Sequence, residues 1–74
     1  MYEFERNGKT IRAYNYGNAR QRQMIENGWR LVLGEFRESP EDIYDRLCGT
    51  YSKIALAYSG TMVRGIHHYF AFVK

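Results

Sequence analysis

The dipeptide Asn7-Gly8 constrains the fold of this 74-residue chain more than any other feature. It separates two segments in which apolar and polar residues alternate, and both central residues of a type I′ turn need the positive φ that Asn and Gly tolerate. Residues 2–6 and 9–14 are therefore predicted to form a β-hairpin. Counting outward from the turn predicts three cross-strand pairs that match apolar residues or opposite charges: Phe4 with Ile11, Glu3 with Arg12, and Tyr2 with Ala13.

The densest aliphatic run of the chain follows its only tryptophan, Trp29. Three consecutive aliphatic residues, 31–33, are typical of a strand that is buried on both faces. We therefore predict that residues 28–33 supply the central strand of a small sheet, onto which the rest of the chain packs.

Capping signals predict a first helix that begins at Asn18. Asn18 is a candidate N-cap and Gln21 can complete a capping box, while Gly28 suits the left-handed residue that ends a helix. Trp29 would then contact Met24. Since few residues of this helix are apolar, we expect it to pack by one narrow edge.

A second helix is predicted to start at Ser39-Pro40, because serine is a good N-cap and proline suits the first helical position. Two interpretations are open beyond it. Apolar residues continue at helical spacing to a stop at Gly60, which permits one long helix. Alternatively Gly49 ends the helix and residues 52–58 form a strand, which is the interpretation that we favour.

Residues 61–73 predict the last strand. Ser59-Gly60 would turn the chain into this strand, and Gly65 would form a bulge within it. Side chains alternate between the two faces of a strand, so His67 and His68 are expected on opposite faces.

Together these elements predict an α+β fold of order ββαβαββ, with a small, mainly antiparallel sheet and two helices on one face. Residues 1–74 form a single domain, near the size at which one core barely stabilises itself. The single cysteine excludes an internal disulfide, so we expect stabilisation from the aromatic residues (7 Tyr, 4 Phe and 1 Trp), or from a homodimer. The unpaired thiol and the lack of a signal sequence favour a cytoplasmic protein with no membrane partner.

The net charge of +3 is unevenly distributed. Residues 6–30 carry six basic side chains and one acid, whereas residues 35–46 carry five acids and two basic side chains. A surface with separate basic and acidic regions helps to orient a binding partner, but it is less suited to binding a polyanion such as nucleic acid.

Candidate catalytic and metal-binding residues are few. His67 and His68 cannot chelate one ion together from opposite faces of a regular strand. Cys48 lies on the apolar edge of the second helix, where we expect a small buried hydrophobe rather than a nucleophile. The sequence contains no zinc-type spacing, phosphate-binding glycine loop or nucleophile elbow. We therefore expect no metal, no cofactor and no catalytic residue.

The acids of the second helix are explained without catalysis. Glu41, Asp42 and Asp45 lie in its first turns and complement the helix dipole. Asp42 and Arg46 are spaced as an i,i+4 ion pair. Glu41, Asp42 and Asp45 are also predicted as an alternative docking patch.

Two short segments resemble the helix–Gly–aromatic–strand and Gly-x-His elements of HicA-type toxins, small double-stranded-RNA-binding-like ribonucleases with a catalytic histidine. The segments are residues 25–32 (Ile-Glu-Asn-Gly-Trp-Arg-Leu-Val) and 65–69 (Gly-Ile-His-His-Tyr), thirteen residues in all. The serine that usually precedes the histidine is missing, and residues 39–58 intervene where the family has a much shorter segment. The resemblance implies a catalytic role for His67, and a small ribonuclease that uses His67 or His68 with Arg64 is our third hypothesis.

The leading hypothesis is a non-enzymatic protein-binding domain that acts as a regulator or inhibitor, a kind of small protein often associated with phages and mobile elements. Tyrosine and arginine are abundant here and dominate interface hot spots. The predicted partner-binding residues are Arg12, Tyr14, Tyr16, Arg20 and Arg22. The second hypothesis is a weak nucleic-acid-binding protein that uses the same residues, since arginines hold phosphates and tyrosines stack on bases.

Overall fold

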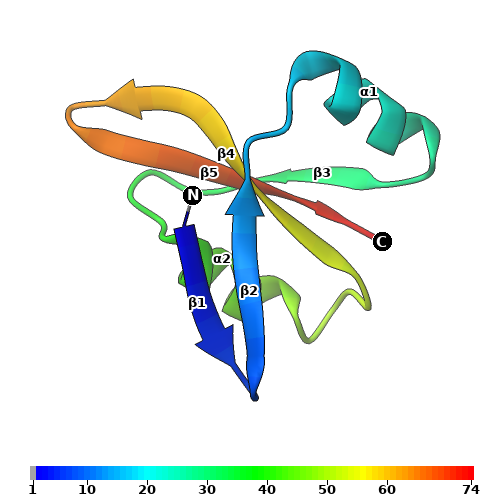
Figure 1. Cartoon of the computed structure of the whole chain (residues 1–74), viewed down its shortest axis with the longest axis horizontal. Helices are drawn as coiled ribbons and strands as arrows, with labels where there is room; N and C mark the ends of the chain where they lie inside the picture. Colours follow the sequence, from blue (N-terminus) through cyan, green and yellow to red (C-terminus); the bar gives the residue numbers. More distant parts are fainter. Residues whose placement is uncertain (1) are drawn as a thin grey trace.

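The computed structural model describes residues 2–74 and contains one five-stranded sheet with two helices (Figure 1). The elements are, in chain order, β1 (Tyr2–Arg6), β2 (Lys9–Tyr14), α1 (Asn18–Glu26), β3 (Arg30–Leu33), α2 (Pro40–Leu47), β4 (Ile54–Val63) and β5 (Ile66–Val73). The strands lie in the order β1-β2-β4-β5-β3, and neighbouring strands are antiparallel except for β2 and β4. The predicted α+β class, the mainly antiparallel sheet and the order ββαβαββ are therefore confirmed.

The N-terminal hairpin has the predicted turn and register. Asn7 and Gly8 have φ angles of 53° and 77°, as a type I′ turn needs. All three predicted cross-strand pairs are present: Phe4 with Ile11, Glu3 with Arg12, and Tyr2 with Ala13. The hairpin could be predicted in this detail because the turn and both strands specify the same register.

A second hairpin joins β4 and β5, and it corrects two predictions. The favoured strand is confirmed from Ile54 onward, but Ser59-Gly60 is not a turn between strands. β4 continues to Val63 with a register irregularity between Tyr58 and Met62. The turn is made by Arg64 and Gly65, whose φ angles are 53° and 77°, so Gly65 does not form a bulge. An arginine at positive φ gives a weaker sequence signal than an asparagine does.

The centre of the sheet is formed by β4 and β5, and the prediction that residues 28–33 supply the central strand is wrong. β3 lies at the edge and pairs with β5 alone. The side chains of Leu31 and Leu33 are 43% and 70% exposed. β5 is buried instead, because it has neighbours on both edges and carries five consecutive apolar residues, 69–73.

The two helices cover opposite faces of the sheet, so their predicted placement on one face is wrong. Met24 of α1 packs in a cluster with Ala57, Phe70 and Phe72. Ile43 and Leu47 of α2 pack in another cluster that includes Leu56, Ala71 and Val73. Neighbouring residues of β5 thus contact different helices, and we name the faces the α1 face and the α2 face after them (Figure 1). Because β4 and β5 are apolar on both sides, each face needs its own cover.

The ends of the helices differ in how well they were predicted. The Ser39 side chain accepts a hydrogen bond from the Asp42 backbone N–H at 3.2 Å, as expected of an N-cap. The N-cap of α1 is Gly17 rather than Asn18, with no side-chain cap. At the other end of α1, Gly28 has the predicted positive φ of 90°, and the Trp29 N–H donates to the Met24 carbonyl at 3.0 Å. This is the hydrogen bond of a Schellman motif.

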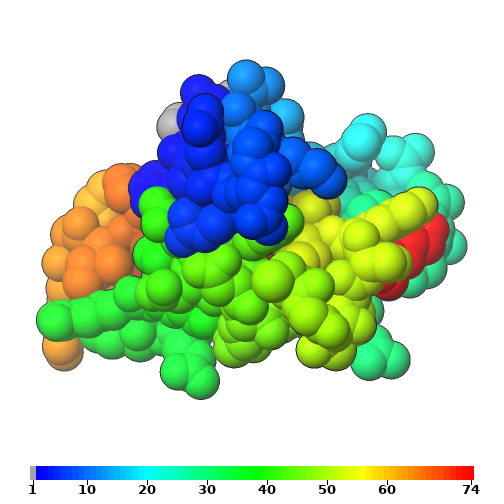
Figure 2. Space-filling model, turned by 90° about the horizontal axis from the view of Figure 1, so that it is seen from below, coloured from blue at the N-terminus to red at the C-terminus, as the bar shows by residue number. Residues whose placement is uncertain are grey.

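The N-terminal hairpin stands against α2, as Figure 2 shows in blue and green. Arg6 donates from Nε to Asp45 Oδ1 and from Nη2 to Glu41 Oε2, both at 3.2 Å. The Tyr2 hydroxyl donates to the other oxygen of Glu41 at 2.8 Å. These bonds close the α2 face at the edge of the sheet.

Candidate functional site

Three of the five predicted partner-binding residues lie together on the α1 face. The rings of Tyr14 and Tyr16 are stacked with centroids 6.0 Å apart and planes 28° from parallel. Tyr16 packs on Phe72, which buries part of its ring. Burial raises the pKa of Tyr16, and the charge of nearby Arg20 acts against this rise. A positive charge therefore lies beside a pair of partly exposed phenol rings.

The other two predicted residues have different surroundings. Arg12 Nε donates to Glu3 Oε2 at 2.9 Å, so its charge is paired within the hairpin, and this bond raises the pKa of Arg12. Arg22 is exposed on α1, where it lines an open depression with Arg20 and Glu26. The carboxylate of Glu26 therefore lies in the same depression as these two arginines.

Sequence reasoning missed the exposed apolar residues of the α1 face. Leu31 pairs with Phe72 and Leu33 with Phe70, so both leucines point to the side of the sheet that α1 covers in part. Phe36 follows β3 and is 51% exposed, with the Arg37 guanidinium 5.4 Å from its ring centroid. We refer to Leu31, Leu33 and Phe36 as the apolar patch.

The acidic residues of α2 are largely engaged within the chain. Glu41 and Asp45 bind Arg6 of β1. The predicted Asp42–Arg46 pair does not form, because Arg46 instead makes two hydrogen bonds to the carboxylate of Glu38, at 2.9 and 3.1 Å. This pairing lowers the pKa of Glu38. The alternative docking patch on α2 therefore offers less free charge than its sequence suggests.

Cys48 is exposed, so its predicted burial is wrong. It is the residue that caps the C-terminus of α2, and its thiol lies 3.4 Å from the Asp45 carbonyl oxygen. Helical spacing placed it beside Leu47, but α2 ends there and the thiol lies beyond the packed face.

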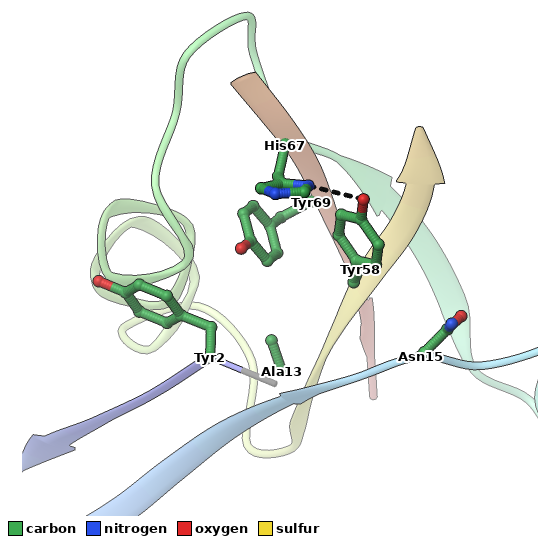
Figure 3. A pocket seen from close by; sticks show the side chains of 6 residues that line it. All are labelled: Tyr2, Ala13, Asn15, Tyr58, His67 and Tyr69. Carbon is green, nitrogen blue, oxygen red and sulfur yellow. Dashed lines mark hydrogen bonds between the residues drawn. The ribbon is translucent and has the colours of Figure 1, made fainter. Parts of the chain in front are cut away.

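A pocket of about 430 Å³ opens on the α2 face, where β2 ends after pairing with β4 at two positions (Figure 3). We name it the tyrosine pocket. Its lining residues come from both hairpins and the segment after β2: Tyr2, Ala13, Asn15, Tyr58, His67 and Tyr69. The His67 ring lies at one side, with Tyr58 and Tyr2 on either side of Tyr69.

The rings of the tyrosine pocket are linked to one another. The Tyr58 hydroxyl lies 2.6 Å from His67 Nδ1, and this nitrogen accepts the bond when the ring proton is on Nε2. The ring centroids of Tyr58 and Tyr69 are 5.7 Å apart, and those of Tyr2 and Tyr69 are 6.0 Å apart. Burial raises the pKa of Tyr69, and the bond to Glu41 raises the pKa of Tyr2. Both phenols therefore stay neutral at physiological pH.

The two histidines lie on opposite faces, as predicted. His67 lines the tyrosine pocket, whereas the His68 ring lies 5.6 Å from Phe36 near the apolar patch. His68 Nε2 is buried without a hydrogen-bond partner in the described part of the chain. Within residues 2–74, no group of three or more His, Cys, Asp or Glu side chains is placed to hold a metal ion.

Neither helix of residues 2–74 combines the length and apolar character that crossing a membrane requires. Comparisons with models of protein families, with curated proteins and with solved structures found no match to this chain. The geometry of the two surfaces is thus the basis for assigning a function.

Proposed function

We propose that this chain is a non-enzymatic protein-binding domain that docks its partner on the α1 face. The observation that carries the proposal is the apolar patch, in which Leu33 is 70% exposed and Phe36 is 51% exposed. Large apolar side chains that gather on one face of a monomer are typical of interaction sites. Burying them against another protein removes apolar area from water, which stabilises the complex by roughly 25 cal/mol for each Å² that is buried.

The remaining residues of the α1 face suit such an interface. Tyr14 and Tyr16 offer aromatic surface beside Arg20, and Arg22 on α1 and Arg37 next to Phe36 are further exposed cations. Aromatic and arginine side chains are enriched at hot spots. The partner surface that fits this composition is apolar with acidic groups at its rim, and binding there would let the domain act as a regulator or inhibitor.

A nucleic-acid ligand is the second candidate, supported by the stacked rings of Tyr14 and Tyr16 beside Arg20. Such a ligand would use few phosphate contacts, since Arg12 is paired with Glu3 and the carboxylate of Glu26 lines the same depression as Arg20 and Arg22. The apolar patch has no role in holding phosphates, and for this reason we favour a protein.

Affinity capture with matched variants tests the proposal. The immobilised chain is exposed to a nuclease-treated lysate of its native host in three forms: wild type, Leu33→Glu with Phe36→Glu, and Met62→Glu. Met62 is the control because it is 55% exposed but pairs with His67 on the α2 face. We expect the same bound proteins for wild type and Met62→Glu, and at least a tenfold loss for the double variant, as for hot-spot residues.

Equal retention by all three forms would contradict the docking surface. Retention from an untreated lysate that disappears after nuclease treatment and falls steeply with salt would favour the nucleic-acid ligand instead.

A further inference from the structure

We propose that the tyrosine pocket is a binding site for an organic ammonium group. The first observation is the inclination of its rings. The planes of Tyr2 and Tyr69 are 61° apart, those of Tyr58 and Tyr69 are 55° apart, and those of Tyr58 and His67 are 70° apart. Inclined rings around one opening can enclose a rounded group, but they cannot sandwich a flat base between parallel faces (Figure 3).

The second observation is the charge around the tyrosine pocket. Its lining contains phenols, an amide, an alanine and one histidine, with no lysine or arginine. The Glu41 carboxylate accepts the Tyr2 hydroxyl at 2.8 Å, and its other oxygen is paired with Arg6 outside the lining at 3.2 Å. A phosphate or carboxylate would therefore meet no lysine or arginine in the lining, whereas an ammonium group would meet several aromatic rings, whose faces attract cations.

The third observation is that the walls of the pocket are held in place without a ligand. The hydrogen bond between Tyr58 and His67 joins β4 to β5, and the bond between Tyr2 and Glu41 fixes the opposite wall to α2. Walls that are already ordered lose little conformational entropy on binding. The Asn15 amide at the rim can hydrogen-bond a polar group that follows the cation.

The volume of about 430 Å³ accommodates a methylated ammonium and part of the chain that carries it. Two sources share this chemistry: a free choline-like molecule, and a lysine or methyl-lysine side chain on a protein. The site lies on the α2 face, so it is independent of the docking surface proposed for the α1 face.

Titration of the ¹⁵N-labelled chain by NMR tests the proposal with four probes: choline, its neutral isostere 3,3-dimethylbutanol, an N-acetyl-trimethyllysine amide, and adenosine monophosphate. We expect the two trimethylammonium probes to shift the amides of Tyr58, His67 and Tyr69. The neutral isostere should bind about tenfold more weakly, since cation–π attraction in a partly open site is worth about 1 to 2 kcal/mol. Tighter binding of trimethyllysine than of choline would identify a protein side chain as the source, and the reverse a free molecule.

Variants locate the binding. Tyr58→Leu removes one wall and Tyr2→Leu removes the opposite, more exposed wall, so each variant should bind choline more weakly than wild type. Circular dichroism checks that each variant is folded, and one variant remains informative if the other does not fold. Tyr14→Leu makes the same change on the α1 face and should bind as wild type does. Equal affinity for choline and 3,3-dimethylbutanol, tighter binding of the nucleotide, or an equal loss in Tyr14→Leu would overturn the proposal.

Discussion

On the α2 face, Ile43 is fully buried and Leu47 nearly so, whereas on the α1 face Met24 is the only buried residue of the helix. α2 also has a side-chain N-cap, and the N-terminal hairpin binds it through Arg6 and Tyr2. α1 has no side-chain cap. One face of the sheet is thus closed by the chain itself, and the other is closed in part.

This difference between the faces accounts for the location of the apolar patch. The apolar patch lies on the face that α1 covers in part, while the α2 face contains the tyrosine pocket and exposes Met62. For this reason we propose a protein partner for the incompletely covered α1 face and a small cationic group for the pocket on the α2 face.

The largest expected difference between the faces concerns core truncation. Ile43→Ala should lower the free energy of unfolding by about 3 to 4 kcal/mol, because it empties a site with no exposed surface. Met24→Ala should lower the free energy of unfolding by about 2 kcal/mol, since α1 packs through this one buried residue and can relax into the space left by the shorter side chain. Urea unfolding followed by circular dichroism measures both, and a larger loss for Met24→Ala would reverse the comparison.

The helix caps provide a second contrast. Ser39→Ala should destabilise the domain by about 1 kcal/mol, because the Asp42 N–H loses its acceptor. Asn18→Ala serves as the matched variant and should change the unfolding free energy by less than about 0.5 kcal/mol, since Asn18 makes no cap hydrogen bond. Equal losses in thermal unfolding would mean that Asn18 caps α1 after all.

Acid should weaken the α2 face through Glu38. The bond to Arg46 holds the pKa of Glu38 below its unfolded value, so the stability it contributes is present above the unfolded pKa and is lost as the pH falls through the folded pKa. Arg46→Gln should remove this part of the acid dependence, a change of at most about 1 kcal/mol for a partly exposed pair. Unfolding curves between pH 6 and pH 3 that have the same pH dependence in both proteins would exclude the pairing.

The smallest expected effect is at the apolar patch. Leu33→Lys should leave the unfolding free energy within about 0.5 kcal/mol of wild type, because the leucine is already 70% exposed. A loss above 1 kcal/mol in urea unfolding would show that Leu33 belongs to the core and would weaken the case for a docking surface.

The sequence predicted those features that neighbouring residues determine. The turn at Asn7-Gly8 fixes a register, Ser39 and Pro40 start a helix, and alternation separates His67 from His68. In each case the interacting groups are close in the chain or in one strand, so no knowledge of the tertiary fold was needed.

Errors arose where several segments compete for one position. The run at residues 31–33 is apolar, but residues 54–58 and 69–73 are longer apolar runs and take the centre of the sheet. A continuous apolar run is typical of a strand that is buried on both faces, so these two runs could have indicated that helices cover both faces of the sheet.

The tyrosine pocket was not predictable, since Tyr2, Asn15, Tyr58 and Tyr69 meet only when both hairpins are in place. The exposure of Leu33 likewise follows from the position of β3 at the edge of the sheet. Both proposed sites depend on tertiary neighbours that no local pattern specifies.

Native-state hydrogen exchange tests most directly whether the two faces are closed unequally. If α1 is held by Met24 alone, its amides should exchange through local opening at a free energy at least about 1 kcal/mol below that of the β5 amides, while the amides of α2 exchange at or near the value for β5. Equal protection of α1, α2 and β5 would mean that the α1 face is as firmly closed as the other, and would contradict the account.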